Sequence, residues 1–448
     1  MGRLFGTDGI RGKANTYLTC EMALKVGRAT ATVLADDRRR LRFCIGCDTR
    51  ISSDMLCQSV AAGLCSAGAD VIMLGVLPTP AVAYLVNKYK ADSGIMISAS
   101  HNSAEYNGIK IFGGEGYKIP DELEERIESI VLDGPEPELS EIEIGKITYA
   151  ENAVRDYVEY LKSTVMNSLD GMEIVVDCSN GSAGQTVGLL LKELGAKATV
   201  LNAKPNGINI NLNCGSTHID LLQKYVVEHG FDVGVAFDGD ADRCICVDGK
   251  GNVIDGDFIM AICALDMKER GKLYKNAVVG TIMTNMGFEK FAKQNGIYTE
   301  TTKVGDRFVL EKMLIEEVSL GGEQSGHIIF KDYATTGDGQ LTAIQLLSIL
   351  KRKGITLAEA ASVMKRFPQY MINVTVSKEG KISFYTDHII KEALEQAKND
   401  FGESGRIVVR PSGTEPMIRV MTEGEDPEQT KDICIRVADI IKERLSDR

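Results

Sequence analysis

No stretch of the sequence approaches the ~20 consecutive apolar residues that a membrane-spanning helix needs, although 44% of the residues are hydrophobic. The amino terminus, Met1 to Thr7, lacks the long apolar core of a secretory signal peptide. It also fails the N-myristoylation pattern, because position 6 is Gly instead of Ser or Thr. These absences predict a cytoplasmic protein without a membrane partner.

Positive charge is scarce as well. The chain has 51 Lys and Arg against 63 Asp and Glu, and its formal net charge is −12. A nucleic-acid-binding surface needs a dominant basic patch, so this balance argues against nucleic acid as a partner. An anionic substrate must be met by individually placed Arg and Lys side chains, because the global field is unfavourable.

Cysteine is too sparse for a disulfide scaffold, with 11 residues in a chain of 448. Cys44 and Cys47 have CxxC spacing, but no second pair follows at the distance of a zinc ribbon. We therefore expect buried, free thiols.

The length and the order of the expected elements indicate several domains. A chain of 448 residues is too long for one core and suggests about three or four domains of ~100–150 residues each. Short β and longer α segments alternate through residues 1–150, 151–254 and 255–368. This alternation predicts three similar doubly wound α/β domains with mainly parallel sheets. From residue 369 to 448 the order becomes strand, helix, strand, strand, helix, which predicts a smaller α+β domain.

Individual elements stand out within this order. The sequence predicts a strand over Glu173–Asp177 and a helix over Pro427–Leu445. Asp133 to Ala150, rich in Pro and Glu and with little periodicity, is typical of a linker. Each of the four predicted domains contributes one polar loop at the end of a strand.

The first of these polar loops follows Ile95, Met96 and Ile97, which predict a short buried strand. Ser98, Ser100 and His101 come directly after it, and ligands of open α/β sheets bind beyond the carboxyl ends of strands. A hydroxyl there, beside an imidazole, is a candidate nucleophile or phosphate carrier. The alternative is a polar turn whose side chains satisfy local backbone groups.

The amino-terminal segment Phe5–Gly12 is punctuated by three glycines and carries Asp8 and Arg11. Glycine permits unusual backbone angles and a close approach to a ligand. A mobile amino-terminal arm is the alternative, and composition alone does not decide between the two.

The second polar loop, Asp238-Gly239-Asp240-Ala241-Asp242, places three carboxylates at alternate positions after a strand. Clustered hard oxygen ligands suit Mg²⁺. A calcium EF-hand loop is rejected, because Arg243 and Gly249 stand where Gly and Glu are required. A solvated acidic turn is the alternative, but three like charges this close repel one another unless a cation neutralises them, which favours a metal site.

The third polar loop runs from Gly322 to His327 and offers the carboxylate of Glu323, the hydroxyl of Ser325 and an imidazole. A glutamate can accept hydrogen bonds from two adjacent sugar hydroxyls. By itself, however, His327 is more typical of a core histidine whose ring nitrogens are hydrogen-bonded within the protein. Lys303 and Arg307 follow another predicted strand and add two cations near the ligand edge of the same domain.

The fourth polar loop, Arg410 to Pro416 with Arg419 beyond it, is consistent with a phosphate clamp. Gly413 allows a turn that points backbone amides at an anion, and Ser412 and Thr414 add hydroxyl donors. An ordinary turn between two antiparallel strands explains the segment equally well. Together, however, a metal site, a hydroxyl carrier, a polyol-binding carboxylate and a phosphate clamp fit phosphoryl transfer on a phosphorylated sugar.

From Phe5 to the carboxyl-terminal helix, through all four loops in order, the chain resembles the α-D-phosphohexomutase superfamily. The resemblance implies three α/β domains and a smaller C-terminal α+β domain around a central cleft. It implies that Ser100 is a phosphoserine and that the phosphate of Ser100 and the three carboxylates of Asp238, Asp240 and Asp242 hold one Mg²⁺ per subunit. The other implied catalytic residues are Lys110, His327 and Arg11. The implied substrate-binding residues are Arg243, Lys303, Glu323, Ser325, Arg410, Ser412, Gly413, Thr414 and Arg419.

Two segments indicate which sugar the substrate contains. Ser98-Ala-Ser-His-Asn102 and Val304-Gly-Asp-Arg307 are similar to the glucosamine branch of the superfamily. The mannose and glucose branch more often shows Thr-Gly-Ser-His-Asn-Pro and, in the later loop, Thr-Gly-His-Ser. Ser103 stands where most relatives carry Pro, which should loosen the turn after Ser100.

The resemblance implies a reversible conversion of glucosamine 6-phosphate to glucosamine 1-phosphate, through phosphorylated Ser100 and a bound 1,6-bisphosphate. It also implies a sugar 1,6-bisphosphate as activator, a homodimer, and a role in supplying UDP-N-acetylglucosamine for cell-wall synthesis. Phosphomannomutase/phosphoglucomutase activity is the alternative within the superfamily. A Mg²⁺-dependent sugar phosphatase and a silent sugar-phosphate-binding protein are the rival classes. Lys110 and His327 are both candidates for the general base.

Overall fold

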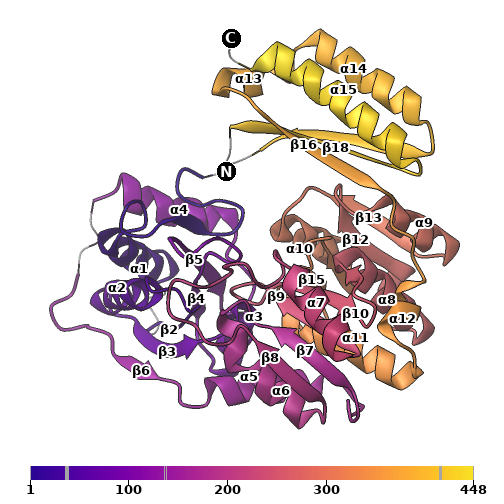
Figure 1. Cartoon of the computed structure of the whole chain (residues 1–448). Helices are drawn as coiled ribbons and strands as arrows, with labels where there is room; N and C mark the ends of the chain where they lie inside the picture. Colours follow the sequence, from indigo (N-terminus) through magenta and orange to yellow (C-terminus); the bar gives the residue numbers. More distant parts are fainter. Residues whose placement is uncertain (1, 36–39, 136, 138, 413–415, 447–448) are drawn as a thin grey trace. The chain divides into compact units, whose positions relative to one another are not determined.

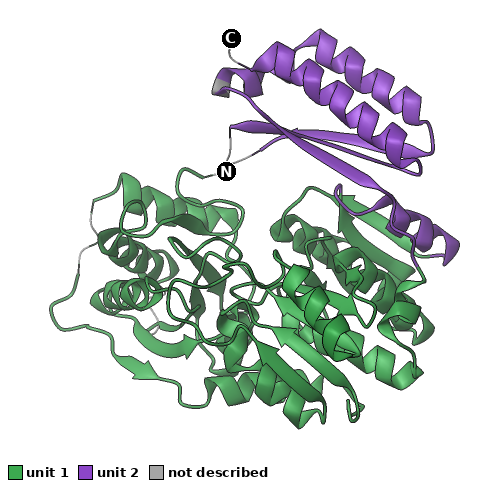
Figure 2. Ribbon diagram, in the orientation of Figure 1, with its two compact units in different colours: residues 1–281, 297–363 green, residues 282–296, 364–448 purple. Residues whose placement is uncertain are grey.

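The structure is a computed structural model that describes residues 2–35, 40–135, 137, 139–412 and 416–446 (Figure 1). The chain divides into two compact units, residues 1–281 with 297–363 and residues 282–296 with 364–448 (Figure 2). The larger unit contains three α/β sheets and the smaller unit contains one antiparallel sheet. Among the described residues, no helix is both long enough and apolar enough to cross a membrane.

The first sheet has six strands in the order β1-β5-β4-β2-β3-β6. β2, β3, β4 and β6 are parallel, whereas β5 runs antiparallel to both β4 and β1. The strands are β1 (Ile10–Lys13), β2 (Arg42–Cys47), β3 (Asp70–Val76), β4 (Ser93–Ile97), β5 (Tyr106–Gly113) and β6 (Ile147–Tyr149). β6 lies inside the predicted linker, so that prediction is wrong for these residues, which pair with β3.

Helices cover both faces of the first sheet. These helices are α1 (Cys20–Leu34), α2 (Ser53–Ser66), α3 (Thr79–Lys88) and α4 (Asp121–Leu132). α1, α2 and α4 share one hydrophobic core with the strands. α3 approaches β2 and β4 at Gly46 and Gly94, where an added Cβ would lie 2.5 Å and 2.4 Å from the side chains of Val82 and Val86. All five residues of β4 are consequently buried, as expected for a strand covered on both faces.

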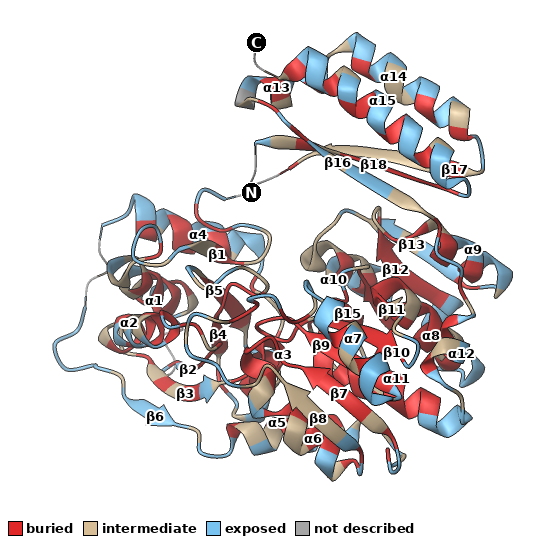
Figure 3. Ribbon diagram, viewed as in Figure 1, coloured by how far each residue is buried: buried red, intermediate tan, exposed pale blue. Residues whose placement is uncertain are grey.

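The second sheet has the order β11-β10-β9-β7-β8 and the third has the order β13-β12-β14-β15. The strands of the second sheet are β7 (Glu173–Asp177), β8 (Lys197–Leu201), β9 (Val233–Phe237), β10 (Cys244–Asp248) and β11 (Val253–Ile254). Those of the third are β12 (Ala277–Thr281), β13 (Tyr298–Thr302), β14 (Leu320–Gly322) and β15 (Ile328–Phe330). Figure 3 shows that β9 and β12 are buried along their whole length.

The helices of the second and third sheets follow the predicted alternation with the strands. They are α5 (Ala153–Ser163), the 3₁₀ turn η1 (Ser182–Gln185), α6 (Val187–Glu193), α7 (Asp220–His229), α8 (Gly256–Glu269), η2 (Tyr274–Asn276), α10 (Asp306–Ile315), α11 (Gly339–Lys353) and α12 (Leu357–Ala361). The prediction of three α/β domains is confirmed.

The three sheets are mainly parallel, as predicted, but each also contains antiparallel pairing at one edge, so all three are mixed. β4 returns as β5, β9 as β10 and β14 as β15, and each of these pairs is antiparallel. The connecting loops, residues 98–105, 238–243 and 323–327, are too short for a crossover, because a parallel connection needs a dozen or more residues. The first three polar loops of the sequence are therefore hairpin loops at the carboxyl ends of β4, β9 and β14.

The smaller unit has the strand order β16-β18-β17, with β16 (Gln369–Thr375), β17 (Gly405–Pro411) and β18 (Met417–Gly424) all antiparallel. Its helices are α9 (Met286–Gln294), α13 (Lys378–Ser383), α14 (His388–Phe401) and α15 (Pro427–Leu445). α14 and α15 pack on one face of the sheet around Ile390, Val420 and Val437. The predicted C-terminal α+β domain is confirmed.

Candidate active site

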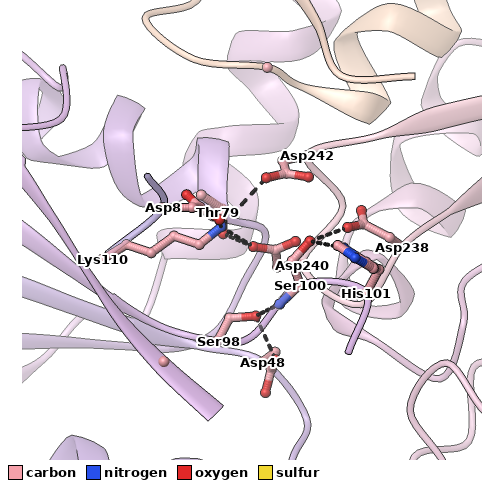
Figure 4. Close-up of polar contacts among 12 residues, drawn as sticks. Asp8, Asp48, Thr79, Ser98, Ser100, His101, Lys110, Asp238, Asp240 and Asp242 are labelled. Carbon is pink, nitrogen blue, oxygen red and sulfur yellow. Dashed lines mark hydrogen bonds and ion pairs between the residues drawn. The ribbon is translucent and has the colours of Figure 1, made fainter. Parts of the chain in front are cut away.

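Ser100 occupies the loop between β4 and β5 and is almost fully buried. Its backbone has φ +53°, in the left-handed region that non-glycine residues rarely adopt. The hydroxyl Oγ donates to Oδ2 of Asp238 at 2.6 Å, and Nδ1 of His101 lies 3.4 Å from the same atom (Figure 4). Burial, together with the charges of Arg243 and Arg11, lowers the pKa of His101 to about 4. The hydroxyl therefore faces the carboxyl group of Asp238 and a neutral imidazole.

The conformation of this loop is held by residues that the sequence analysis did not single out. The Ser100 amide donates to Oγ of Ser98 at 2.9 Å, and Oγ of Ser98 donates to Oδ2 of Asp48 at 2.6 Å. Arg50, wholly buried, pairs with Asp48 at 2.8 Å. The guanidinium of Arg50 donates to the carbonyls of Ser100, Asn102, Ser103 and Tyr106. The sequence could have indicated these two residues, because Asp48 and Arg50 come just after β2, at the same end of the sheet as Ser100.

Asp238, Asp240 and Asp242 lie together in the β9–β10 loop, and one carboxylate oxygen from each falls within 4.8 Å of the others. All three residues are buried. Burial, together with the charges of Asp242 and Asp240, raises the pKa of Asp238 well above its usual range. Oδ1 of Asp240 and Oδ1 of Asp242 are buried and have no hydrogen-bond partner. Buried carboxylate oxygens without donors fit a hard cation such as Mg²⁺.

Lys110, on β5, carries its ammonium into the same cluster. Nζ lies 2.9 Å from Oδ2 of Asp240, 3.0 Å from Oδ2 of Asp8 and 3.5 Å from Oδ2 of Asp242 (Figure 4). Burial would lower the pKa of Lys110, but these three carboxylates outweigh it and raise the pKa well above its usual value. Lys110 is thus a buried, protonated donor.

His327, at the end of the β14–β15 loop, points its two ring nitrogens at different groups. Nδ1 lies 3.7 Å from Oδ2 of Asp242, and Nε2 accepts the amide of Gly337 at 3.1 Å. Burial opposes the charged ring, but Asp242 and then Asp306 raise the pKa of His327. The donation from Gly337 places the proton of the neutral ring on Nδ1, facing Asp242.

The β9–β10 loop, residues 238–243, is called the metal loop because it carries the three clustered aspartates. Main-chain contacts join it to the third polar loop. Arg243 and His327 form an isolated antiparallel bridge, and the amide of Cys244 donates to the Gly326 carbonyl at 3.0 Å. The Arg243 amide also donates to Oδ1 of Asp238 at 3.2 Å. Burial opposes the Arg243 charge, but Asp238, Asp242 and Glu323 raise its pKa. These contacts fix Arg243 between the carboxylate cluster and Glu323.

The amino-terminal segment is tied into the site. Asp8 pairs with Arg11, Lys110 and Lys118, and Lys118 pairs in turn with Asp306 at the start of α10. Burial opposes ionisation of Asp8, but Lys110, Lys118 and Arg11 hold its pKa well below the usual range. Lys118 and Asp306 are thus charged neighbours of the site that the sequence analysis did not single out.

The predicted sugar-binding residues of the third sheet are close in sequence but differ in burial. Glu323 is buried, and Oε1 accepts the Gly305 amide at 2.9 Å. Ser325 is exposed, and the exposed Lys303 ammonium lies 5.9 Å from the centre of the Phe308 ring.

The predicted phosphate clamp lies in the smaller unit. Arg410 of β17 stands directly opposite Arg419 of β18, and the Ser412 amide donates to the Met417 carbonyl at 2.9 Å. Ser412 is buried. Gly413 and Thr414 lie outside the described residues.

Four family models match consecutive parts of the chain. They describe the phosphoglucomutase/phosphomannomutase α/β/α domain I over residues 2–138, domain II over 155–251, domain III over 255–367 and the C-terminal domain over 371–440. The chain belongs to the phosphoglucomutase/phosphomannomutase family, as the sequence motifs predicted.

Within the family, similar curated relatives are phosphoglucosamine mutases. That of Acetivibrio thermocellus is 51% identical over 448 residues, covering 99% of this chain and 100% of the relative. That of Caldanaerobacter subterraneus is 52% identical over 447 residues, covering 100% of both chains.

Solved structures share the fold at low identity. A phosphoglucomutase/phosphomannomutase family protein of Burkholderia thailandensis aligns with TM-score 0.83 and 22% identity, covering 99% of this chain and 98% of the other. The N-acetylphosphoglucosamine mutase of Aspergillus fumigatus, solved with GlcNAc-6P and magnesium, aligns with TM-score 0.72 and 17% identity over 99% and 96% of the chains.

Proposed function

We propose that this protein is a phosphoglucosamine mutase, which interconverts glucosamine 6-phosphate and glucosamine 1-phosphate. The relatives that carry this name match the whole chain at about half identity. The observation that carries the proposal is the hydrogen bond from Oγ of Ser100 to Asp238, at the edge of a buried cluster of three carboxylates. It brings a candidate phosphoryl carrier to a candidate metal site.

Asp238, Asp240 and Asp242, with the phosphate of phosphorylated Ser100, would hold Mg²⁺. The two buried oxygens of Asp240 and Asp242 that lack donors support this assignment. When bound, the ion neutralises negative charge on the transferring phosphoryl group. The Aspergillus relative, which was solved with magnesium, supports the same identity for the metal.

The phosphoryl group moves from Oγ of Ser100 to a hydroxyl of the sugar phosphate, and the hydroxyl proton passes to a base. A second transfer returns the other phosphoryl group of the 1,6-bisphosphate to Ser100, whose own hydroxyl proton must then be accepted. Lys110 and His327 are the candidates from the sequence, and Lys110 would first have to lose the proton that its three carboxylate neighbours stabilise. Asp238 and His101, which contact Oγ of Ser100, are two further candidates. Lys110, Arg11 and Arg243 supply positive charge around the transferring group.

Glu323 and Ser325 would bind sugar hydroxyls, and Lys303 would add a cation at the same edge. The phosphate that is not reacting would be bound by Arg410, Ser412, Gly413, Thr414 and Arg419. The register supports this role, because Arg410 and Arg419 are directly opposite each other and so share one face of the sheet.

Several parts of the hypothesis remain predictions. They are the domain division at residues 150, 254 and 368, the homodimer, the sugar 1,6-bisphosphate activator and the cytoplasmic location. Phosphomannomutase/phosphoglucomutase activity remains the alternative reaction, since the matching family models carry that description.

The test is intact-protein mass spectrometry followed by assay. We expect one phosphate on the native chain, absent from Ser100→Ala, and conversion of glucosamine 6-phosphate in preference to the glucose and mannose 6-phosphates. Full mutase activity of Ser100→Ala would refute the carrier. A preference for glucose or mannose phosphate would establish the alternative, and steady release of inorganic phosphate would indicate a phosphatase.

A further inference from the structure

Asn211, in the long connection between β8 and α7, reaches into the loop that carries Ser100. Nδ2 of Asn211 donates to the carbonyl of Ser100 at 2.9 Å and to the carbonyl of Asn102 at 3.0 Å. Both acceptors are carbonyl oxygens, so only the amide nitrogen can occupy this position, and the orientation of the side chain is fixed. A residue from the domain of the second sheet thus binds the backbone of a loop from the first.

The same amide lies against the metal loop. A Cβ added to Gly239 would fall 2.9 Å from Nδ2 of Asn211 and 2.6 Å from the Ser100 carbonyl. Asn211 is buried, and its own amide donates to the Ser179 carbonyl at 2.9 Å. Its backbone has φ +58°, a left-handed conformation that Asn tolerates better than most residues. The side chain therefore sits where the Ser100 loop, the metal loop and the second domain meet.

Arg50 contacts the same two carbonyls. Nη2 of Arg50 donates to the Ser100 carbonyl at 2.9 Å and to the Asn102 carbonyl at 2.8 Å. Arg50 belongs to the domain of the first sheet, so it shapes the Ser100 loop within its own domain. Asn211 belongs to the domain that carries Asp238, so it can set the distance between the two domains' loops.

The direct contact between these loops depends on the chemical state of Ser100. The hydrogen bond from Oγ of Ser100 to Asp238 exists only while Oγ carries its proton. Phosphorylation replaces that proton, whereas the hydrogen bonds of Asn211 are made to backbone carbonyls and need no serine hydroxyl. The hydrogen bonds of Asn211 to the Ser100 loop therefore do not depend on whether Oγ of Ser100 carries a proton or a phosphate.

We propose that Asn211 is a positioning residue for phosphoryl transfer, which keeps the Ser100 loop in register with the metal loop throughout the catalytic cycle. This inference rests on the proposed function of Ser100 as carrier. A displacement of about 1 Å can lower the rate of a reaction about 10²-fold when the reacting groups must be aligned. Nδ2 of Asn211 binds two backbone carbonyls of the loop that carries the reacting hydroxyl, so loss of the side chain should lower kcat more than it raises KM.

The test compares Asn211→Ala and Asn211→Gly with Asn213→Ala as the matched control. Asn213 lies in the same connection, is exposed and has φ +53°, so its replacement imposes a similar backbone change. Asn211→Gly removes the side chain but accommodates the left-handed backbone. We expect both Asn211 variants to lose about 10–100-fold in kcat, the range seen when a supporting hydrogen bond at a reactive centre is removed. KM should change less than about twofold, and Asn213→Ala should keep native activity.

Wild-type kcat in Asn211→Gly would overturn the inference, since it would show that only the backbone conformation matters. A rise in KM with unchanged kcat would also overturn it, because the residue would then serve substrate binding. Thermal melting and the phosphate content of each variant are measured alongside. Absence of phosphate from wild-type Ser100 would refute the proposed function itself, a result distinct from either outcome in the Asn211 variants.

Discussion

Oγ of Ser100 donates a 2.6 Å hydrogen bond to Oδ2 of Asp238, 138 residues further along the chain. The two residues come from hairpin loops of different sheets, at the points where β4 and β9 end. In each hairpin the chain reverses direction within a short loop, and no crossover helix covers the polar tip. The tip therefore packs against the neighbouring domain. The contact therefore joins the candidate phosphoryl carrier to the candidate metal site.

Asp238→Asn should separate the catalytic and structural effects of this carboxylate. It keeps an oxygen acceptor for Ser100 but removes one of three crowded negative charges. We expect activity to fall by about 10²–10³-fold, the range for loss of one preorganised electrostatic group. Without metal the variant should be more stable, because burial, followed by repulsion from Asp242 and Asp240, disfavours the ionised form of Asp238 and raises its pKa. A gain of about 1 kcal/mol would raise Tm by about 2–4 °C in a domain of moderate size. A lower Tm in EDTA would contradict this account.

Magnesium should stabilise the native chain by mass action. An ion that binds only the folded state adds about 2.7 kcal/mol to the free energy of unfolding at a concentration 100 times its Kd. We expect thermal melting to rise with Mg²⁺ and to return to its starting value with EDTA, in parallel with loss of mutase activity. Asp240→Asn, which alters a buried metal-ligand candidate, should abolish the shift. An equal Mg²⁺ shift in Asp240→Asn would place the ion elsewhere.

Lys118→Met should destabilise the larger unit. The Lys118 ammonium is mostly buried and pairs with Oδ1 of Asp8 at 2.5 Å and with Asp306. Asp8 keeps Arg11 and Lys110 in the variant, but Asp306 loses its ammonium partner. Breaking a buried ion pair by removing one partner costs about 3–5 kcal/mol. The control is Lys197→Met, which breaks the exposed pair with Glu173 and should have a far smaller effect. Denaturant unfolding measures both, and equal losses would show that burial is irrelevant here.

Asp338→Asn should change the pH dependence of stability. Asp338 caps α11 through the Leu341 amide at 2.9 Å and accepts the Tyr157 hydroxyl at 2.7 Å. Burial raises the pKa of Asp338 to about 6, above its ordinary value of 3.8. The folded state then binds this proton more tightly than the unfolded state, so stability falls as pH rises from about 4 to about 6.

The Asn variant retains a capping side chain and has no proton to lose. Relative to wild type it should gain up to about 3 kcal/mol between pH 4 and pH 7, since one pKa unit corresponds to about 1.4 kcal/mol. Urea unfolding in EDTA across this range provides the measurement. Tyr157→Phe is the companion variant, because its hydroxyl lowers the pKa of Asp338. A pH-independent difference between Asp338→Asn and wild type would refute the assignment.

Local pattern alone determined much of the secondary structure. The predicted strand Glu173–Asp177 and helix Pro427–Leu445 match the structure at both ends. Apolar runs and amphipathic periodicity are properties of neighbouring residues, so the sequence records them directly. The same is true of the polar loops, because an abrupt change of polarity after Ile97 or Phe237 marks the end of a buried strand.

Tertiary structure decided how those loops meet. β5 (Tyr106–Gly113) and α4 (Asp121–Leu132) were not predicted as elements, and the antiparallel return of β5 is what makes the Ser100 loop a hairpin. Arg50 and Asn211 act on backbone carbonyls, and Lys118 meets Asp306 188 residues away. Hydrogen bonds to main-chain oxygens and long-range ion pairs leave no periodic trace in the sequence. The sequence alone could therefore name the carrier and the metal carboxylates, but only the packing of the domains identifies the residues that hold them together.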